Sequence, residues 1–250
     1  MNFLKIKNMQ FAGLLMVLTP LVFTTAFISD DDFESIFNGN DLSGWVIPEG
    51  DNGHWKVVDG VIDYDALSEA SGDKNLWSEE EYGDFVLRFD WRIKETPFIN
   101  QNVRIVKPDG SHQLDADGND ITIAVPDSDS GVYLRGSSKA QVNIWNWPVG
   151  SGEVYGYRND SSMPPEVRAG VTPTKFADNN VGEWNSFEIT MIGDRLTVEL
   201  NGHVVVEDVQ LPEIPDQGPI AFQHHGGKVD GEWSSPPSLV QFRDVSIKEL

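Results

Sequence analysis

The chain has 250 residues, with 18 Lys plus Arg against 40 Asp plus Glu, which gives a formal net charge of −22 at pH 7. This excess of negative charge argues against nucleic acid and anionic membrane surfaces as partners, because both carry the same sign of charge. Cysteine is absent, so the fold has no disulfide and depends on its hydrophobic core.

Residues 1–26 have the pattern of a secretory signal peptide. Lys5 and Lys7 precede an apolar run over residues 11–26. Pro20 interrupts this run, which is already short for the ~20 residues of a membrane-spanning helix, so cleavage is favoured over an uncleaved anchor. We therefore expect a periplasmic or secreted mature protein, residues 27–250, with no stable membrane insertion.

The first elements expected in residues 27–250 are short β-strands. Asp59-Gly60 joins two alternating apolar runs and predicts a tight hairpin. Residues 85–93 form the clearest strand, because apolar side chains alternate with polar ones that include Arg88 and Asp90. One face of this strand should belong to the core and the other should be polar.

Residues 95–130 interrupt the alternation and are expected to form a hairpin insertion. Turns are predicted at 108–110 (Pro-Asp-Gly) and at 117–118 (Asp-Gly). The DADGND run within it lacks the glycine placement and the distal glutamate of an EF-hand. A solvated acidic turn is therefore favoured over a calcium loop.

The remaining strands repeat the two-faced pattern, with a meander over 183–209 that turns at 193–194 and 201–202, and a long closing strand. Helical periodicity does not extend over a useful length. The predicted fold is all-β: a single antiparallel β-sandwich domain in which one sheet is concave and has a polar face.

Aromatic, guanidinium and amide side chains are concentrated in residues 131–170. Other strands carry polar side chains at alternate positions, which would place them on the same sheet face. Flat rings cover the C–H faces of sugars, while planar polar groups bind their hydroxyls. A floor of such groups is costly unless it is paired or used. The substrate-binding residues predicted on this basis are Arg88, Asp90, Gln141, Asn143, Trp145, Trp147, Tyr155, Tyr157, Glu166, Arg168, Gln223 and His224.

Two adjacent histidines should point to opposite faces of one strand. His225 shares its parity with Gln223 and should face the polar floor, whereas His224 should point into or along the core. The other histidines lie beside turns or in the insertion, so no three-histidine metal centre is indicated.

Two glutamates could serve acid/base chemistry. Glu153 and Glu166 flank an aromatic segment, but pairing with Arg158 and Arg168 is an equally good interpretation. The Glu-x-Asp-x-x-Glu strand of sandwich-fold β-glucanases is absent, which argues against a conventional glycoside hydrolase.

Several stretches together resemble the 3-keto-disaccharide hydrolase domain family of bacterial exported proteins: FNGNDLSGW, WKVVDGVI, LWSEEEYGDFVLRFDWR, SGVYLRG, GEWNSFEITMIGDRLTVELNG and GPIAFQHHG. The resemblance covers nearly all of residues 27–250. It implies a concanavalin A-like jelly roll that acts on glycosides whose C3 hydroxyl has been oxidised to a ketone. Common members read Tyr-Glu-Val-Gln where this chain has Ala-Gln-Val-Asn at 140–143, which suggests a subgroup.

A ketone at C3 makes the C2 proton acidic, so a base can remove it and expel the aglycone from C1, after which water can add back. The predicted base is His225 or Glu153, and Arg135 or Arg158 would stabilise the enolate. A divalent metal ion could do so instead, although no ligand spacing requires it or any other cofactor. The alternative functions are a lectin-like carbohydrate-binding module and a conventional glycoside hydrolase, since the fold does not decide function.

Overall fold

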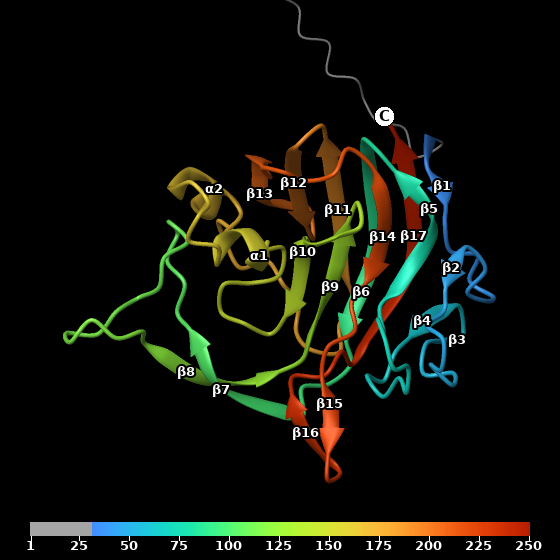
Figure 1. The fold of residues 1–250 in the computed structure, drawn as a ribbon, viewed down its shortest axis with the longest axis horizontal. Coiled ribbons are helices and arrows are strands. Elements are labelled where there is room, and N and C mark those ends of the chain that lie inside the picture. The colour runs from blue at the N-terminus through green and yellow to red at the C-terminus, as the bar shows by residue number, and fades with distance from the viewer. Residues whose placement is uncertain (1–31) are drawn as a thin grey trace, which may run out of the picture. The chain divides into compact units, whose positions relative to one another are not determined.

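Two antiparallel sheets pack face to face in the computed structural model, which describes residues 32–250 (Figure 1). The predicted signal peptide lies outside these residues. The larger sheet has the strand order β13 (His203–Gln210), β12 (Arg195–Leu200), β11 (Asn185–Ile192), β6 (Phe85–Ile93), β17 (Val240–Glu249), β4 (Val61–Asp63) and β3 (Lys56–Val58), with β1 (Glu34–Ser35) paired to β17. The smaller sheet has the order β10 (Ser137–Trp145), β9 (Asp129–Leu134), β14 (Gly218–Phe222), β5 (Leu76–Tyr82) and β2 (Trp45–Val46).

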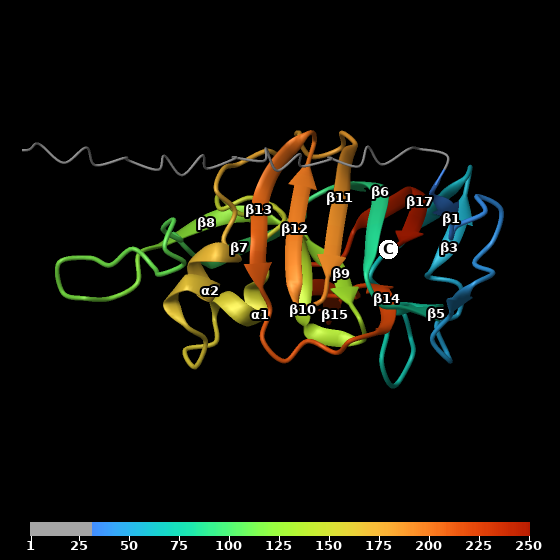
Figure 2. The ribbon, with the colours of Figure 1, turned by 90° about the horizontal axis from the view of Figure 1, so that it is seen from above.

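Two hairpins and two short helices lie outside the main sheets. The hairpins are β7 (Phe98–Arg104) with β8 (Thr122–Asp127), and β15 (Gly227–Val229) with β16 (Glu232–Ser235). Helix α1 (Tyr155–Arg158) packs against β10, and α2 (Pro165–Gly170) packs against β13. Figure 2 shows the long segment between β7 and β8 extending beyond the sheets. Within residues 32–250, none of the helices is long and apolar enough to cross a membrane.

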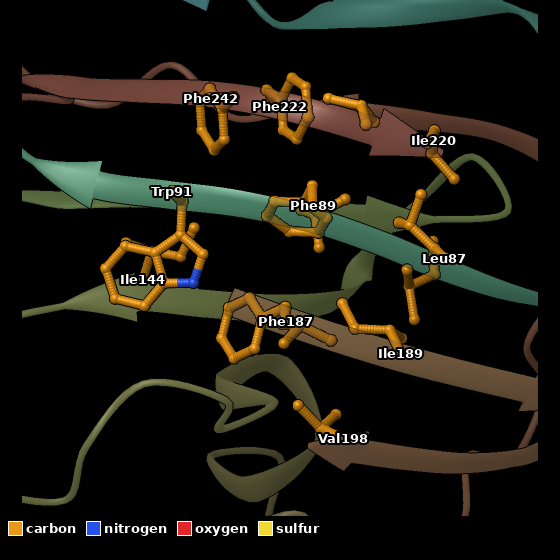
Figure 3. Packing of buried hydrophobic residues seen from close by; sticks show 14 of the residues in the cluster. Leu87, Phe89, Trp91, Ile144, Phe187, Ile189, Val198, Ile220, Phe222 and Phe242 are labelled. Carbon is orange, nitrogen blue, oxygen red and sulfur yellow. The ribbon is translucent and has the colours of Figure 1, made fainter. Parts of the chain in front are cut away.

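The core lies between the two sheets and is rich in aromatic rings (Figure 3). Phe222 of the smaller sheet stacks on Phe242 of the larger sheet, with ring centroids 3.8 Å apart. Phe89 meets Phe222 edge-on at 5.5 Å. Alternate residues of each strand therefore fill one interior, and the predicted antiparallel β-sandwich is confirmed.

The predicted tight turns are present, and they have the backbone conformation that their residues favour. Asp59 and Gly60 have φ of 51° and 79° between β3 and β4, and Asn201 and Gly202 have φ of 52° and 76° between β12 and β13. Asn, Asp and Gly tolerate this left-handed region, which matches the twist of a two-residue hairpin.

The polar face of β6 is not part of the concave floor, contrary to the prediction for Arg88 and Asp90. Strand β6 lies in the larger sheet, where Arg88 pairs with Glu188 at 2.7 Å and Asp90 pairs with Arg243 at 2.9 Å on the outer surface. The prediction was wrong because alternation shows which side of a strand is apolar but not to which sheet the strand belongs.

Candidate active site

A pocket of about 340 Å³ lies on the face of the smaller sheet that is turned away from the core. Its lining consists of Asn100, Asp129, Gln141, Asn143, Trp145, Trp147, Tyr155, Gln223, His225 and Pro236. A larger pocket between β1 and β5 has five carboxylates among its thirteen lining residues and holds no histidine or tryptophan. The smaller pocket therefore combines the aromatic rings, amides and histidine predicted for a sugar site, and it contains seven of the predicted site residues.

The pocket floor follows from the register of β9 and β10. Gln141 is opposite Tyr133, Asn143 is opposite Gly131, and Trp145 is opposite Asp129. Residues opposite one another across an antiparallel pair point to the same face, so these side chains form one surface. Gly131 allows the close approach, since a Cβ there would lie 2.6 Å from Gln141 Nε2.

Amide groups of this floor are held in fixed orientations. Gln141 Nε2 donates to Gln223 Oε1 and to the Ser130 carbonyl, the latter at 3.2 Å. Asn143 Nδ2 donates to the Glu153 carbonyl at 3.0 Å. Because Gln223 accepts through its oxygen, its amide nitrogen is the donor of this side chain, and it has one N–H for Tyr133 and a second for a ligand.

Aromatic rings form one wall of the pocket. Trp145 and Trp147 stack with centroids 4.1 Å apart and planes 3° apart, and Tyr155 meets them edge-on at 6.0 and 6.4 Å. The two indole nitrogens donate to the Gly150 carbonyl and to Asp127 Oδ2, both at 2.8 Å. The rings are thus oriented before any ligand arrives, as a stacking site for a sugar requires.

His225 and Asp129 are the titratable pair of the pocket. His225 Nδ1 lies 2.6 Å from the Pro236 carbonyl, which can only accept, so Nδ1 carries the proton. In the neutral ring Nε2 then has the lone pair, and it faces Asp129 Oδ2 at 4.0 Å. Burial raises the pKa of Asp129 to about 7, with Asp127 acting in the same direction and His225 opposing it.

Asp129 was not among the predicted residues, although its parity with Gly131 and Tyr133 could have placed it on the polar face. Asn100 comes from the β7–β8 hairpin, and Pro236 follows β16. No local pattern indicated that either hairpin would reach this pocket, because that depends on tertiary packing.

Arg135 lies away from the pocket, which corrects its predicted place beside the substrate. It occupies the β9–β10 turn with φ of 49°, at the opposite end of β9 from Asp129. Its guanidinium group is buried and donates to Asp84 at 2.9 Å and to the carbonyls of Gly83 and Gly193 at 2.8 and 2.6 Å. Arg135 therefore ties loops together and is not positioned to contact an enolate in this pocket.

Glu153 and Arg158 form a buried ion pair that does not line the pocket. Glu153 is fully buried and accepts from Arg158 Nε, and burial raises its pKa to about 7 although Arg158 opposes the rise. Arg158 Nη1 also donates to His112 Nε2 at 3.0 Å. The pair thus lies beside the pocket, which it contacts through the Glu153 carbonyl that binds Asn143 and through the Arg158 guanidinium over the Tyr155 ring, 5.2 Å from its centroid.

Three further predicted residues lie outside the pocket. The Tyr157 hydroxyl donates to the Pro212 carbonyl at 2.9 Å, and Arg168 Nε donates to the Arg158 carbonyl at 2.8 Å. Glu166 is exposed in α2. These residues shape the α1–α2 segment and have no direct access to a ligand in the pocket.

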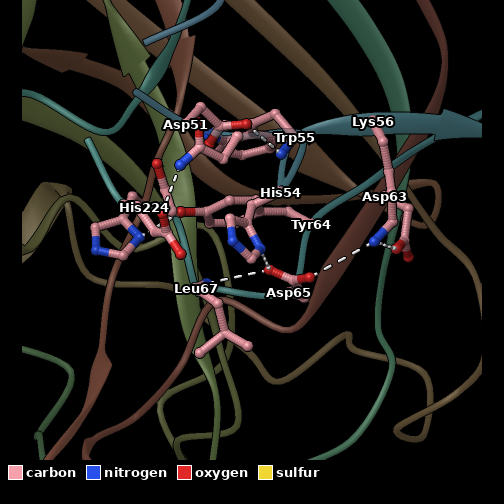
Figure 4. Close-up of polar contacts among 12 residues, drawn as sticks. Asp51, His54, Trp55, Lys56, Asp63, Tyr64, Asp65, Leu67 and His224 are labelled. Atoms are coloured by element: carbon pink, nitrogen blue, oxygen red, sulfur yellow. Dashed lines mark hydrogen bonds and ion pairs between the residues drawn. The ribbon is translucent and has the colours of Figure 1, made fainter. Parts of the chain in front are cut away.

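His224 packs on the other side of the strand end from His225. Its Nδ1 lies 2.6 Å from the Tyr64 hydroxyl, and its backbone N–H donates to Asn75 Oδ1 at 2.8 Å (Figure 4). Burial lowers the pKa of His224 to about 4, with Lys74 and His225 adding to the effect. His224 is therefore a neutral hydrogen-bond acceptor for Tyr64, and it is not part of the pocket lining predicted for substrate.

Within the described chain, no group of three or more His, Cys, Asp or Glu side chains is arranged to hold a metal ion. Residues 32–250 therefore offer no defined site for the divalent ion considered from the sequence.

Comparison with known proteins follows from this geometry. The sequence model of the 3-keto-alpha-glucoside-1,2-lyase-like domain family matches residues 32–248. The chain belongs to this family. The membership confirms the predicted resemblance and points to a carbohydrate-active hydrolase or lyase, or to a carbohydrate-binding module.

Solved structures agree on the fold of this family member. A candidate glycosyl hydrolase from Parabacteroides distasonis is 19% identical, covers 90% of this chain and 98% of its own, and has a TM-score of 0.52. A second candidate glycosyl hydrolase from the same organism is also 19% identical, with coverages of 87% and 99% and a TM-score of 0.50. No curated protein sequence matches the chain.

Proposed function

We propose that this family member cleaves 3-keto-glycosides by elimination at C1 and C2 of the oxidised sugar. The observation that carries the proposal is the approach of His225 Nε2 to the Asp129 carboxyl group, 4.0 Å apart in a pocket lined by amides and stacked tryptophans. A base and an acid with access to the same small space suit a reaction that removes one proton and delivers another.

The reaction assigns one role to each member of this pair. His225 Nε2 takes the proton from C2, and the electrons of the C2–H bond pass into the C3 ketone to form an enolate. When the enolate collapses, a double bond forms between C1 and C2, the bond from C1 to the glycosidic oxygen breaks, and Asp129 protonates that oxygen. Addition of water across the new double bond would give the hydrolysis product.

Uncharged donors stabilise the enolate in this proposal. Arg135, Arg158 and Asn100 donate to other partners, whereas the amide N–H groups of Gln223 line the pocket. Fixed N–H groups directed at developing negative charge are effective in a pocket that excludes water.

The alternative is a lectin-like module, which would use the same amides and rings without turnover. Sugar binding alone does not require an imidazole beside a carboxyl group, so the His225–Asp129 pair favours an enzyme. A conventional glycosidase would need two carboxyl groups flanking the bond, and Asp129 is the one carboxylate in the described lining of the pocket.

The test is incubation of the protein in D2O with 3-keto-glucosides and with the same glucosides unoxidised. We expect release of the aglycone from the keto forms alone and deuterium at C2 of the hydrated product. Asp129→Asn should bind the keto substrate and release little aglycone. Efficient cleavage of unoxidised glucosides would contradict the proposal, and binding of both forms without turnover would favour the lectin-like module.

A further inference from the structure

Asp127 lies just behind the pocket and holds two of its wall residues. This side chain is fully buried at the end of β8. Its Oδ2 accepts from Asn100 Nδ2 at 2.9 Å and from Trp147 Nε1 at 2.8 Å. These donors come from segments far apart in the chain, and both line the pocket although Asp127 does not.

The other oxygen of Asp127 has an unusual environment. Oδ1 is buried and has no hydrogen-bond partner in residues 32–250, and the same holds for Oδ1 of Asp129. A buried carboxylate oxygen without a partner destabilises a fold, so its presence calls for an explanation. If Asp127 only linked Asn100 to Trp147, a neutral acceptor side chain could do the same.

The position of Asp127 beside Asp129 suggests a further task. Burial is the main cause that raises the pKa of the Asp129 carboxyl, His225 opposes the rise, and Asp127 adds to it. Burial raises the pKa of Asp127 as well, while its hydrogen bonds with Asn100 and Trp147 favour its charged form. A like charge nearby keeps a carboxyl group protonated to higher pH. The proposed elimination requires Asp129 in that protonated form.

We propose that Asp127 is a positioning residue that fixes Asn100 and Trp147 in the pocket wall and keeps Asp129 in its acid form. This inference rests on the proposed function. It separates two effects of one side chain: the hydrogen bonds of Oδ2 should govern substrate binding, and the negative charge should govern the pH range of turnover.

The experiment compares Asp127→Asn with two other variants of the full chain, using a 3-keto-glucoside over a range of pH. Asp127→Asn removes the charge and keeps an acceptor oxygen. Activity should fall with rising pH as Asp129 ionises, and in this variant the fall should occur about one pH unit lower than in the wild type. Asn100→Ala removes a donor and keeps the charge, so KM should rise several-fold while the pH profile stays in place.

Asp178→Asn is the matched control. Asp178 is another carboxylate whose pKa is raised by burial, and it accepts from the Ser151 backbone N–H at 3.1 Å outside the pocket lining. Its substitution should leave the pH profile unchanged. An unchanged profile for Asp127→Asn, or an equal shift for Asp178→Asn, would overturn the proposal.

Failure of the proposed function can be recognised separately. If the wild type turns over no 3-keto-glucoside, the Asp129 carboxyl can still be titrated by 13C NMR in the wild type and in both Asn variants. A lower Asp129 pKa in Asp127→Asn, but not in Asp178→Asn, would support the electrostatic role of Asp127. Equal titration curves would refute it whatever the activity of the protein. Should Asp127→Asn not fold, Trp147→Phe decides the positioning role, because it keeps an aromatic ring in the wall and removes the donor to Asp127 Oδ2. KM should then rise while the pH profile stays in place, and an unchanged KM would refute the role.

Discussion

At the scale of single residues, two neighbouring histidines have different tasks. His225 holds its Nδ1 proton against the Pro236 carbonyl and presents Nε2 to the pocket. His224 accepts from Tyr64 on the other side of the chain. The pair offers a direct comparison of the proposed base with a structural histidine within one dipeptide.

We expect His225→Ala to fold normally and to lose about 10²–10⁴-fold in turnover, which is the usual cost of removing a general base. His224→Ala should keep most activity per folded molecule and should lose roughly 1–3 kcal/mol of stability, because the Tyr64 hydroxyl loses its partner. Thermal melts and turnover measured on both variants test this. A fully active His225→Ala would show that another group is the base.

The stability of the wild type should also depend on His224 in a defined pH range. Its pKa in the folded state, about 4, is below the ordinary value of 6.5, so protons bind more strongly to the unfolded chain. The contribution of His224 is therefore complete above pH 6.5 and is lost as the pH falls toward 4. His224→Gln should flatten this part of the curve of melting temperature against pH, and an unchanged curve would contradict the assignment.

Sequence reasoning placed most floor residues because each lies on a strand whose parity can be read, as for Gln141, Asn143 and Gln223. It placed Arg135 wrongly because the alternation of side chains was extended from β9 to residue 135. The strand ends at Leu134, and Arg135 lies in the turn. It overestimated Glu153 as a base, since burial beside Arg158 is a tertiary feature that spacing does not reveal.

At the scale of elements, the buried ion pair of Glu153 and Arg158 is linked by a hydrogen bond to the segment between β7 and β8. Arg158 of α1 contacts Glu153 and also His112, which lies 3.3 Å from Asp120 in that segment. The desolvation of such a pair is costly, and removing one partner leaves a buried charge without compensation.

We therefore expect Glu153→Ala and Arg158→Ala each to destabilise the fold by about 3–5 kcal/mol. Lys139→Ala is the matched control, because it breaks the half-exposed ion pair of Lys139 with Asp160, and exposed pairs are worth about 0–1 kcal/mol. Denaturant unfolding of the three variants measures these differences. Normal stability of Glu153→Ala combined with lost turnover would return Glu153 to a catalytic role.

The prediction of elements from sequence succeeded where a local rule applies. Asp59-Gly60 and Asn201-Gly202 specify hairpins through the backbone conformations they tolerate. The assignment of β6 to the larger sheet could not be predicted, because pairing between strands distant in sequence is decided by the packing of the whole core. The stretch 95–130, which contains β7 and β8, was likewise recognised as an insertion, but not as a source of the pocket residue Asn100.

At the scale of the whole molecule, the chain carries an excess of acidic groups and no cysteine. Its net charge becomes −24 when residues 1–26 are removed, since that segment holds two lysines and no acidic residue. Strong net charge favours solubility outside the cell, where 3-keto-glycosides would meet the pocket without uptake. We propose on these grounds that the protein acts in the periplasm or the medium.

This proposal predicts a mature chain that begins near Phe27. The basic start and the apolar run interrupted by Pro20 favour cleavage by a signal peptidase over retention as an anchor. Mass spectrometry of protein from the periplasm or medium should therefore find residues 27–250, and Lys5→Glu with Lys7→Glu should slow export without changing the melting temperature of the mature form. Lys175→Glu, an exposed site in the mature domain, should leave export unaffected. Recovery of chains starting at Met1 in the membrane fraction would show that the segment is an anchor, because a cleaved leader cannot remain on the exported protein.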